Sequence, residues 1–252
     1  MKKQTFVFTV FLLAMVHFSF SQSSFVDYQK SFSRVSQAFI NKEVALKKQF
    51  AAKHISWPQK YMYIRSFKYN GEMEVWVKNN TVDSFTYFKT YKICALAGTL
   101  GPKRMEGDFQ VPEGFYYIND FNGNSTYHLS LGLNYPNPAD KMISDAERPG
   151  GDIFIHGSCV TVGCIPINND QIEELYVLST YAKAGGQDFI PVHIFPAKYH
   201  EKKSEEYLEN FVQSEPALRD FEKNLKKVYD FFEDHRKLPV VAITDTGKYV
   251  FY

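Results

Sequence analysis

Two residues with the chemistry of a thiol acyltransferase lie eight positions apart in the segment 155–167, which reads IHGSCVTVGCIPI. A thiol attacks a carbonyl as its thiolate, so it needs a base for its proton and hydrogen-bond donors for the oxyanion. His156 is predicted to end a strand and take the proton of Cys164, because a neighbouring imidazole can lower a cysteine pKa below about 8.5. Gly163 allows a sharp turn, so its N–H and that of Cys164 are expected to point at the carbonyl oxygen.

The same residues also fit other kinds of site. The chain has three cysteines, Cys94, Cys159 and Cys164, which are too few for a disulfide scaffold and leave at least one thiol over. His156, Cys159 and Cys164 could bind zinc with His193 as a fourth ligand, but the second close pair of a strong zinc pattern is missing. A Cys159–Cys164 disulfide is a further alternative, with a demanding geometry because the loop between them is short.

The N-terminus has the pattern of an export signal. Lys2 and Lys3 precede an apolar run over 6–16, and small residues at 19–21 offer a cleavage site near Ser21. The alternative is a membrane anchor, but the run is shorter than the roughly 20 residues of a membrane span. Cleavage removes two Lys and no acidic residue, which changes the formal charge from +1 to about −1. We therefore expect neither a nucleic-acid partner nor a polybasic membrane surface.

The rest of the chain predicts an α+β protein with a strand-rich centre. The 252 residues are 44% hydrophobic and 17% aromatic, which suits a large folded core with pleated strands. Amphipathic patterns predict helices over 25–50, over 170–184 and from Pro216 onward, whereas 134–151 has few strand signals and is predicted to be a long loop. Strands are predicted over 61–69, 72–78, 84–94, 115–118, 127–133, 153–155, 189–195, 240–244 and 248–252.

The segment IHGSCVTVGC resembles the active-site signature of the YkuD L,D-transpeptidases, where an Ile-His-Gly strand end is followed by Ser/Thr-x-Gly-Cys. It is most similar to the YafK branch, which often carries an extra Cys between the two halves. The stretches GPKRMEGDFQVPEGFY (101–116) and LNYPNPAD (133–140), the C-terminal helix and the ending GKYV (247–250) resemble the same branch. The resemblance covers about residues 60–252.

Carried over position by position, the resemblance implies a set of site residues. Cys164 is the nucleophile, His156 is its base, and the carbonyl of Gly157 orients His156, with Gly163 beside the nucleophile. Val162 departs from the His that many family members have there, and we expect this position to shape the cleft and the choice of acceptor. Cys159 is expected to be a bystander. The residues expected to contact substrate are Lys103, Arg104, Tyr135, Asn137 and Thr161.

The implied fold is α+β, a mostly antiparallel β-sandwich of the L,D-transpeptidase type with an N-terminal helix and a C-terminal helical extension. We expect a signal peptide at 1–21, an N-terminal helical segment at 22–58, a catalytic domain at 59–197 and the extension at 198–252. The expected location is the periplasm or the cell wall.

The implied activity is a peptidoglycan L,D-transpeptidase that forms a Cys164 thioester with the stem peptide and passes it to an amine. No cofactor or metal is expected, and the expected partners are stem peptides and a wall-attached protein, with the chain as a monomer. One alternative is an amidase or L,D-carboxypeptidase that hydrolyses wall-protein or stem-peptide bonds at the same site. Another is a non-catalytic cell-wall binding module, which an intact Cys–His pair disfavours.

Overall fold

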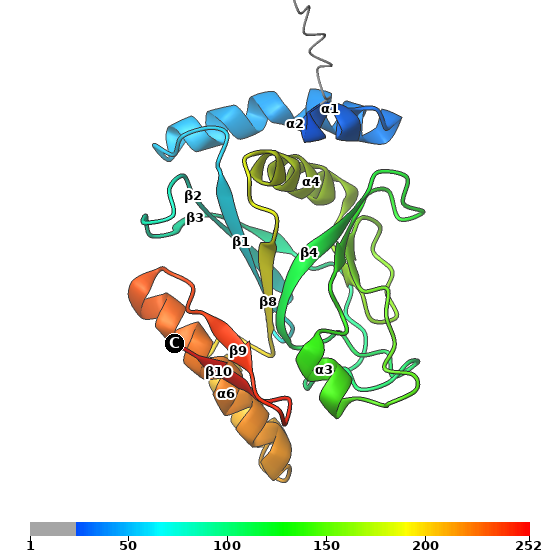
Figure 1. Ribbon diagram of the computed structural model, residues 1–252, viewed down its shortest axis with the longest axis vertical. Helices are drawn as coiled ribbons and strands as arrows, with labels where there is room; N and C mark the ends of the chain where they lie inside the picture. Colours follow the sequence, from blue (N-terminus) through cyan, green and yellow to red (C-terminus); the bar gives the residue numbers. More distant parts are fainter. Residues whose placement is uncertain (1–23) are drawn as a thin grey trace, which may run out of the picture.

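A single eight-stranded sheet forms the centre of the protein in the computed structural model, which describes residues 24–252 (Figure 1). The strand order is β3-β2-β1-β8-β4-β5-β6-β7, and the pairs β1–β8 and β6–β7 are parallel while the others are antiparallel. The strands are β1 (Tyr61–Phe67), β2 (Glu72–Lys78), β3 (Thr86–Lys92), β4 (Gly114–Asn122), β5 (Ser130–Leu133), β6 (Phe154–His156), β7 (Ile165–Pro166) and β8 (Ile190–Phe195). The predicted α+β class is confirmed. Its β layer is one curled sheet that contains both parallel and antiparallel pairs. The predicted signal peptide lies outside the described residues.

Both faces of the sheet are covered, so its central strands are buried on both sides. In β1, Met62 and Ile64 face one core, while Tyr63 and Phe67 face two further hydrophobic clusters on the other side. This division follows from the alternation of side chains along a strand. Asn70 and Gly71, between the strands predicted over 61–69 and 72–78, lie in the turn that joins β1 to β2, and Gly71 has the positive φ of 62° that such turns favour.

Three helices cover the first face (Figure 1). α4 (Asn169–Ala184) lies on the sheet, and α1 (Phe25–Lys30) and α2 (Ser33–Ala52) pack on α4. The single helix predicted over 25–50 is instead two helices that meet at Ser31–Phe32. α4 begins at a capping box in which the Asn168 side chain accepts from the Gln171 N–H. Asn168 is the residue directly after the IHGSCVTVGCIPI segment, which ends at Ile167.

The C-terminal residues cover the second face. This layer consists of α5 (Lys202–Phe211), α6 (Pro216–His235) and the hairpin β9 (Val241–Ile243) with β10 (Tyr249–Phe251). Leu225 and Tyr229 of α6 pack with Phe67 and Phe195 of the sheet. Pro216 occupies the first helical turn of α6, as its fixed φ favours.

A short helix lies in the segment that was predicted to be a loop. α3 (Pro138–Ile143) begins at Asn137, whose side chain accepts from the Asp140 N–H in a capping box, and Pro138 stands in its first turn. The prediction of a loop over 134–151 is therefore wrong for these six residues. The capping signal was in the sequence, but α3 is too short for a hydrophobic period to show it.

The two edges of the curled sheet come together. Ile93, just after β3, forms a bridge with Ile167, just after β7, and the Cys94 N–H donates to the Pro166 carbonyl oxygen over 3.0 Å. Contacts between the outermost strands protect both sheet edges. The strands that carry the IHGSCVTVGC segment are thus fixed from two sides.

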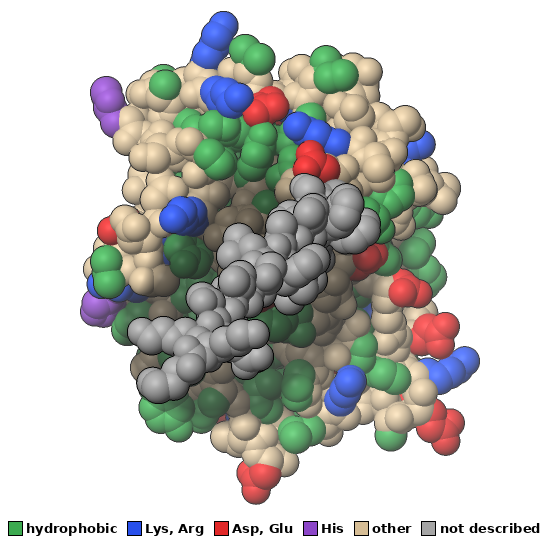
Figure 2. Space-filling model, turned by 45° about the horizontal axis from the view of Figure 1, so that its top comes forward, with side chains coloured by type: hydrophobic (Ala, Val, Ile, Leu, Met, Phe, Trp, Pro, Cys, Tyr) green, Lys and Arg blue, Asp and Glu red, His purple; other side chains and the backbone are tan. Residues whose placement is uncertain are grey.

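No helix within residues 24–252 is both long and apolar enough to span a membrane. The end of the molecule formed by α1 and α2 faces forward in Figure 2, where basic and acidic side chains are interspersed over the visible face. That distribution agrees with the near-neutral charge read from the sequence.

Candidate active site

Cys164 lies immediately before β7, at the edge of the sheet. Its Sγ accepts from the Phe154 N–H over 3.4 Å, and its thiol donates to the Asp152 carbonyl oxygen over 3.4 Å. The parallel register pairs Ile155 with Ile165, which sets Cys164 opposite Phe154. Because alternate residues of a strand share a face, Cys164 and His156 are on the same face of the β6–β7 pair. The pairing thus places the two residues that the sequence singled out on one face of neighbouring strands.

His156 ends β6 and is held on all sides. Its carbonyl oxygen accepts from the Ile167 N–H over 2.9 Å, and its ring packs on Tyr127 with the centroids 4.7 Å apart. Its Nδ1 lies 2.5 Å from the carbonyl oxygen of Gly157. With Nδ1–H donating to this carbonyl, Nε2 is the unprotonated nitrogen and can accept a proton. The contact predicted for Gly157 is present in the structure.

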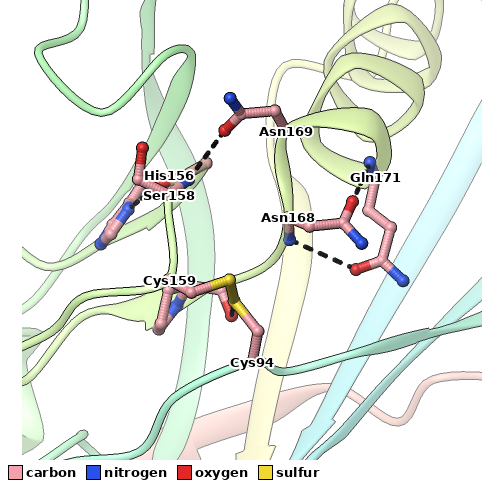
Figure 3. Close-up of a disulfide and its surroundings, with 9 residues drawn as sticks. Cys94, His156, Ser158, Cys159, Asn168, Asn169 and Gln171 are labelled. Atoms are coloured by element: carbon pink, nitrogen blue, oxygen red, sulfur yellow. Dashed lines mark hydrogen bonds between the residues drawn. A yellow bond between two sulfur atoms is a disulfide. The ribbon is translucent and has the colours of Figure 1, made fainter.

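The turn after His156 needs a glycine. A Cβ on Gly157 would lie 2.7 Å from Asn169 Oδ1 and 2.9 Å from the Tyr127 carbonyl oxygen, closer than real Cβ contacts. Ser158 follows with a positive φ of 64°, and its N–H donates to Asn169 Oδ1 over 2.9 Å. Figure 3 shows this contact between the His156 turn and the start of α4. Helix α4 therefore fixes the carbonyl that orients the histidine.

The loop before Cys164 is stabilised by Thr161. Its Oγ1 donates to the Cys164 carbonyl oxygen over 2.8 Å and accepts from the Gly163 N–H over 3.0 Å. The expectation that the Gly163 N–H is free for an oxyanion does not agree with this contact, because a nearby hydroxyl already accepts from it. Thr161, predicted to contact substrate, is seen here to shape the loop. Gly163 has φ +139°, and a Cβ there would lie 3.1 Å from the Gln110 carbonyl oxygen.

The other two cysteines form a disulfide between Cys94 and Cys159 (Figure 3). This bond overturns the alternative of a Cys159–Cys164 disulfide and removes Cys159 from the alternative zinc site. Within residues 24–252, no group of three or more His, Cys, Asp or Glu side chains is arranged to hold a metal ion. Cys164 is the remaining thiol, and the disulfide ties the loop between His156 and Cys164 to the chain that follows β3.

Burial keeps both members of the pair neutral. Burial raises the pKa of the Cys164 thiol above its ordinary value. The negative charge of Asp152 raises this pKa further, whereas the hydrogen bond from the Phe154 N–H and the positive charge of Lys103 lower it. Burial also lowers the pKa of His156, against the effect of its hydrogen bond with Gly157. At neutral pH the resting residues are therefore a thiol and a neutral imidazole rather than a thiolate and an imidazolium.

A pocket of about 250 Å³ opens onto Cys164. Three stretches of chain line it: Lys103, Glu106, Gly107 and Phe109 from the first, Gly150 to Ile153 from the second and Val162 to Cys164 from the third. Lys103 Nζ donates to Asp108 Oδ1 over 2.5 Å, and a Cβ on Gly150 would lie 2.8 Å from Lys103 Cε. Of the residues expected on the rim, Lys103 lies at this pocket, although its side chain is only 5% exposed.

The other expected rim residues lie elsewhere. Tyr135 is buried, and its hydroxyl donates to the Pro149 carbonyl oxygen over 2.9 Å. Asn137 is buried too, and its Nδ2 donates to the Phe115 carbonyl oxygen and to the Tyr249 hydroxyl. Arg104 lines a different pocket, beside α6. The expectation of a substrate-contacting rim does not fit Tyr135 and Asn137, because internal hydrogen bonds engage these buried side chains.

Four groups that contribute contacts to the site were not predicted from the sequence. They are the Asp152 carbonyl and the Phe154 N–H at the thiol, the Tyr127 ring on His156, and Asn169 at the turn. Two act through the backbone, which no residue type reveals. Tyr127 is distant in sequence, whereas the position of Asn169 at the helix start was a signal that could have been used.

Comparison with known proteins identifies relatives of this chain. The model of the YkuD L,D-transpeptidase catalytic domain matches residues 68–194, which contain His156, Gly157, Gly163 and Cys164. The protein named "Putative L,D-transpeptidase YafK" of Escherichia coli K12 is 33% identical over 192 residues, 75% of this chain and 73% of the relative.

Two solved structures were also compared. The helical cell shape determining protein Pgp2 of Campylobacter jejuni has 17% identity and a TM-score of 0.43 over 75% of each chain. Bd1075 of Bdellovibrio bacteriovorus has 24% identity and a TM-score of 0.39, over 63% of this chain and 58% of that one. The family model covers about half of the chain, and the Escherichia coli relative covers three quarters of it. The chain therefore belongs to the YkuD family of L,D-transpeptidases.

Proposed function

We propose that the protein is a peptidoglycan L,D-transpeptidase in which Cys164 is the nucleophile and His156 its base. The observation that carries this proposal is the pairing of β6 with β7, which gives the remaining thiol and a carbonyl-oriented imidazole the same sheet face. Cys164 also borders an open pocket, as a nucleophile must. An intact thiol beside an oriented base argues against a non-catalytic wall-binding module.

In the acylation step, Cys164 attacks the carbonyl of the third residue in a tetrapeptide stem. The resting thiol donates to the Asp152 carbonyl oxygen, so it must turn toward His156 Nε2 when substrate arrives. Because both groups are neutral at rest, proton transfer to His156 accompanies the formation of the carbon–sulfur bond. The amide C–N bond then breaks, and the imidazolium returns the proton to the amine of the leaving terminal residue.

In the second step an amine attacks the thioester, and the carbon–sulfur bond breaks to give an amide and the free thiol. His156 takes a proton from the incoming amine and passes one to the sulfur. The Cys164 N–H is our candidate oxyanion donor, because the Gly163 N–H already donates to Thr161. Lys103 has a supporting electrostatic role, since its charge favours the thiolate. None of these steps calls for a metal or a cofactor.

The remaining assignments follow from this activity. We propose that 1–21 is a cleaved signal peptide, that 22–58 is an N-terminal helical segment, that 59–197 is the catalytic domain and that 198–252 packs on it as an extension. The substrate lies outside the cytoplasm, so the proposed location is the periplasm or the cell wall. We propose that the chain acts as a monomer.

A second candidate, the hydrolysis of a bond between the wall and a protein, is favoured by the mouth of the pocket. Phe109 and Val162 line the pocket while being 56% and 71% exposed. Met105 and Val160, close to them in the chain, are about half exposed. Exposed apolar side chains around a site suit a partner with apolar surface, which a protein offers and a stem peptide largely lacks. Water would then replace the amine in the second step.

Purified mature protein incubated with disaccharide-tetrapeptide, with and without a second stem peptide as acceptor, tests this assignment. Transpeptidation predicts release of the terminal residue together with a cross-linked dimer in the liquid-chromatography profile. Hydrolysis predicts tripeptide without dimer, or release of wall-bound protein from isolated cell wall. If Cys164→Ala protein gives the same products as wild type, neither version of the proposal holds.

A further inference from the structure

A second pocket, of about 590 Å³, lies between the catalytic domain and the C-terminal extension. Its walls come from α3, from the first half of α6 and from the turn of the β9–β10 hairpin. Figure 1 shows the hairpin tip beside α3 and α6. Neither the thiol nor the imidazole lines this pocket, so it is separate from the candidate active site.

The walls of this pocket are held in place by close contacts. A Cβ on Gly247, in the hairpin turn, would lie 2.9 Å from Ile143 Cγ2 of α3, so the turn and the helix touch. Asn137 joins α3 to the hairpin through its 2.8 Å hydrogen bond to the Tyr249 hydroxyl. The pocket is therefore preformed, which lowers the entropy cost of filling it.

The charges that line the pocket are mostly positive. Four basic side chains, Arg104, Lys223, Lys227 and Lys248, face one acidic side chain, Asp220. Within residues 24–252, none of these three lysines forms an ion pair with a carboxylate. By contrast, Lys226 on the same helix is paired with Asp230. Lys223 and Lys227 are four residues apart on α6, a spacing at which like charges repel. An anion in the pocket would offset that repulsion.

Arg104 adds directed donors to this field. Its guanidinium lies over the Phe221 ring, 5.6 Å from the centroid, and is 3.7 Å from the buried Asp140 carboxylate. A guanidinium has five N–H donors in a planar fork that fits a carboxylate, so donors remain for a ligand. The preceding residue, Lys103, lines the Cys164 pocket. The two pockets thus share the Lys103–Arg104 segment as a wall.

We propose that this pocket is an anion subsite that binds a carboxylate of the wall peptide while another part of the wall reaches Cys164. The identity of the ligand rests on the proposed function, whereas the anion preference rests on the lining charges. The C-terminal extension then has a binding role, because it supplies three of the four basic residues.

Binding of disaccharide-tetrapeptide to Cys164→Ala protein, measured by calorimetry, tests the proposal without catalysis. The charge reversals Lys223→Glu and Lys227→Glu together are expected to weaken binding about tenfold or more. Lys202→Glu with Lys203→Glu, on exposed α5 residues outside the pocket, is the matched control and should change binding less than twofold. Amidation of the fragment's carboxylates should weaken binding to the unaltered pocket by a similar factor.

Three results would overturn the subsite: equal binding by the pocket variant, equal loss in the control variant, or equal binding of the amidated fragment. Inorganic phosphate provides a further arm, because competition by phosphate alone with no response to amidation would identify a phosphate site instead. Should the double reversal lower the melting temperature, Lys223→Gln with Lys227→Gln gives the same comparison with less charge change. Acylation of Cys164 by the fragment is measured separately, so loss of the subsite and loss of the proposed activity are distinguishable.

Discussion

Within residues 24–252 two histidines on the sheet are buried, and they differ in what surrounds them. His156, at the sheet edge, is 2% exposed, and His193, in β8 under the C-terminal layer, is 5% exposed. Burial lowers the pKa of both, that of His193 to about 3 with a contribution from the Arg65 charge. The Nδ1 of His156 contacts a backbone carbonyl, and that of His193 lies 2.9 Å from the Tyr63 hydroxyl.

The surroundings, rather than the shifted pKa, separate a base from a packing residue. His193 is enclosed by the rings of Tyr63 and Phe115 and has no thiol beside it. His156 shares a sheet face with Cys164, which opens onto a pocket. A perturbed pKa marks a functional site only when a reactive partner and an access route accompany it.

The largest expected effect separates the two histidines by activity. His156→Ala is expected to lower turnover of the folded protein by about 10²–10⁴-fold through loss of the base, in addition to the stability lost by truncating a buried ring. His193→Ala should leave turnover of the folded protein within a few-fold and cost about 2–4 kcal/mol of unfolding free energy, because it creates a cavity and strands the Tyr63 hydroxyl. Turnover and urea unfolding of both variants measure the two effects. The reverse pattern would reassign the roles.

The disulfide at the catalytic edge provides the second prediction. Cys94→Ser with Cys159→Ser is expected to lower the unfolding free energy by about 2–4 kcal/mol, because the bond closes a loop with a sequence separation of 65. Turnover should fall as well, since the bond holds the loop that joins His156 to Cys164. Urea unfolding with and without dithiothreitol provides the control, because reductant should change wild type and leave the double variant unaffected. Equal stability of all samples would show that the closed sheet holds without the bond.

The low pKa of His193 predicts a pH dependence of stability. The unfolded chain protonates this residue near pH 6.5 and the folded one near pH 3, so stability falls as pH drops through that window. Between pH 7 and pH 5 the loss is about 2 kcal/mol. Burial raises the pKa of Asp140 to about 6, which acts in the opposite direction. The Asp140 contribution is common to wild type and His193→Gln, so it cancels in the difference between their unfolding free energies. If this difference stays constant with pH, the account of His193 is contradicted.

The smallest expected effect concerns the Thr161 hydroxyl. Thr161→Val removes the two hydrogen bonds that it makes with Gly163 and Cys164, which is expected to cost about 1 kcal/mol of stability. Thr161→Ser retains both and is the control. Turnover and thermal melts of the two variants show whether loop shape matters for the nucleophile. A Val variant as stable and as active as wild type would show that the hydroxyl does not stabilise the loop.

Much of the catalytic edge could be predicted from the sequence, because its chemistry lies in thirteen consecutive residues. The strand end at His156 and the glycines on either side of the loop follow from residue types and from the resemblance, and the same pattern singles out Cys164 as the proposed nucleophile. The hairpin at Asn70-Gly71 and helix α4 could also be predicted, since their turn and cap signals are local.

What the sequence could not supply depends on contacts between distant segments. The Cys94–Cys159 pairing needs the two sheet edges to meet, and Asn137 is buried because α3 packs under the C-terminal hairpin. The hydrogen bond from Gly163 to Thr161 depends on loop geometry that residue types do not fix. Local patterns therefore singled out the candidate reactive residues but not the contacts that surround them.

The central claim is that Cys164 carries the acyl group. Wild-type protein mixed with disaccharide-tetrapeptide and quenched in acid within seconds can be analysed by intact-mass and peptide-mapping mass spectrometry. The account predicts an adduct that adds the mass of the substrate less that of the free terminal amino acid, on the peptide that contains Cys164, strongly reduced in His156→Ala and absent in Cys164→Ala. An adduct on another residue, or full turnover by Cys164→Ala, would contradict it.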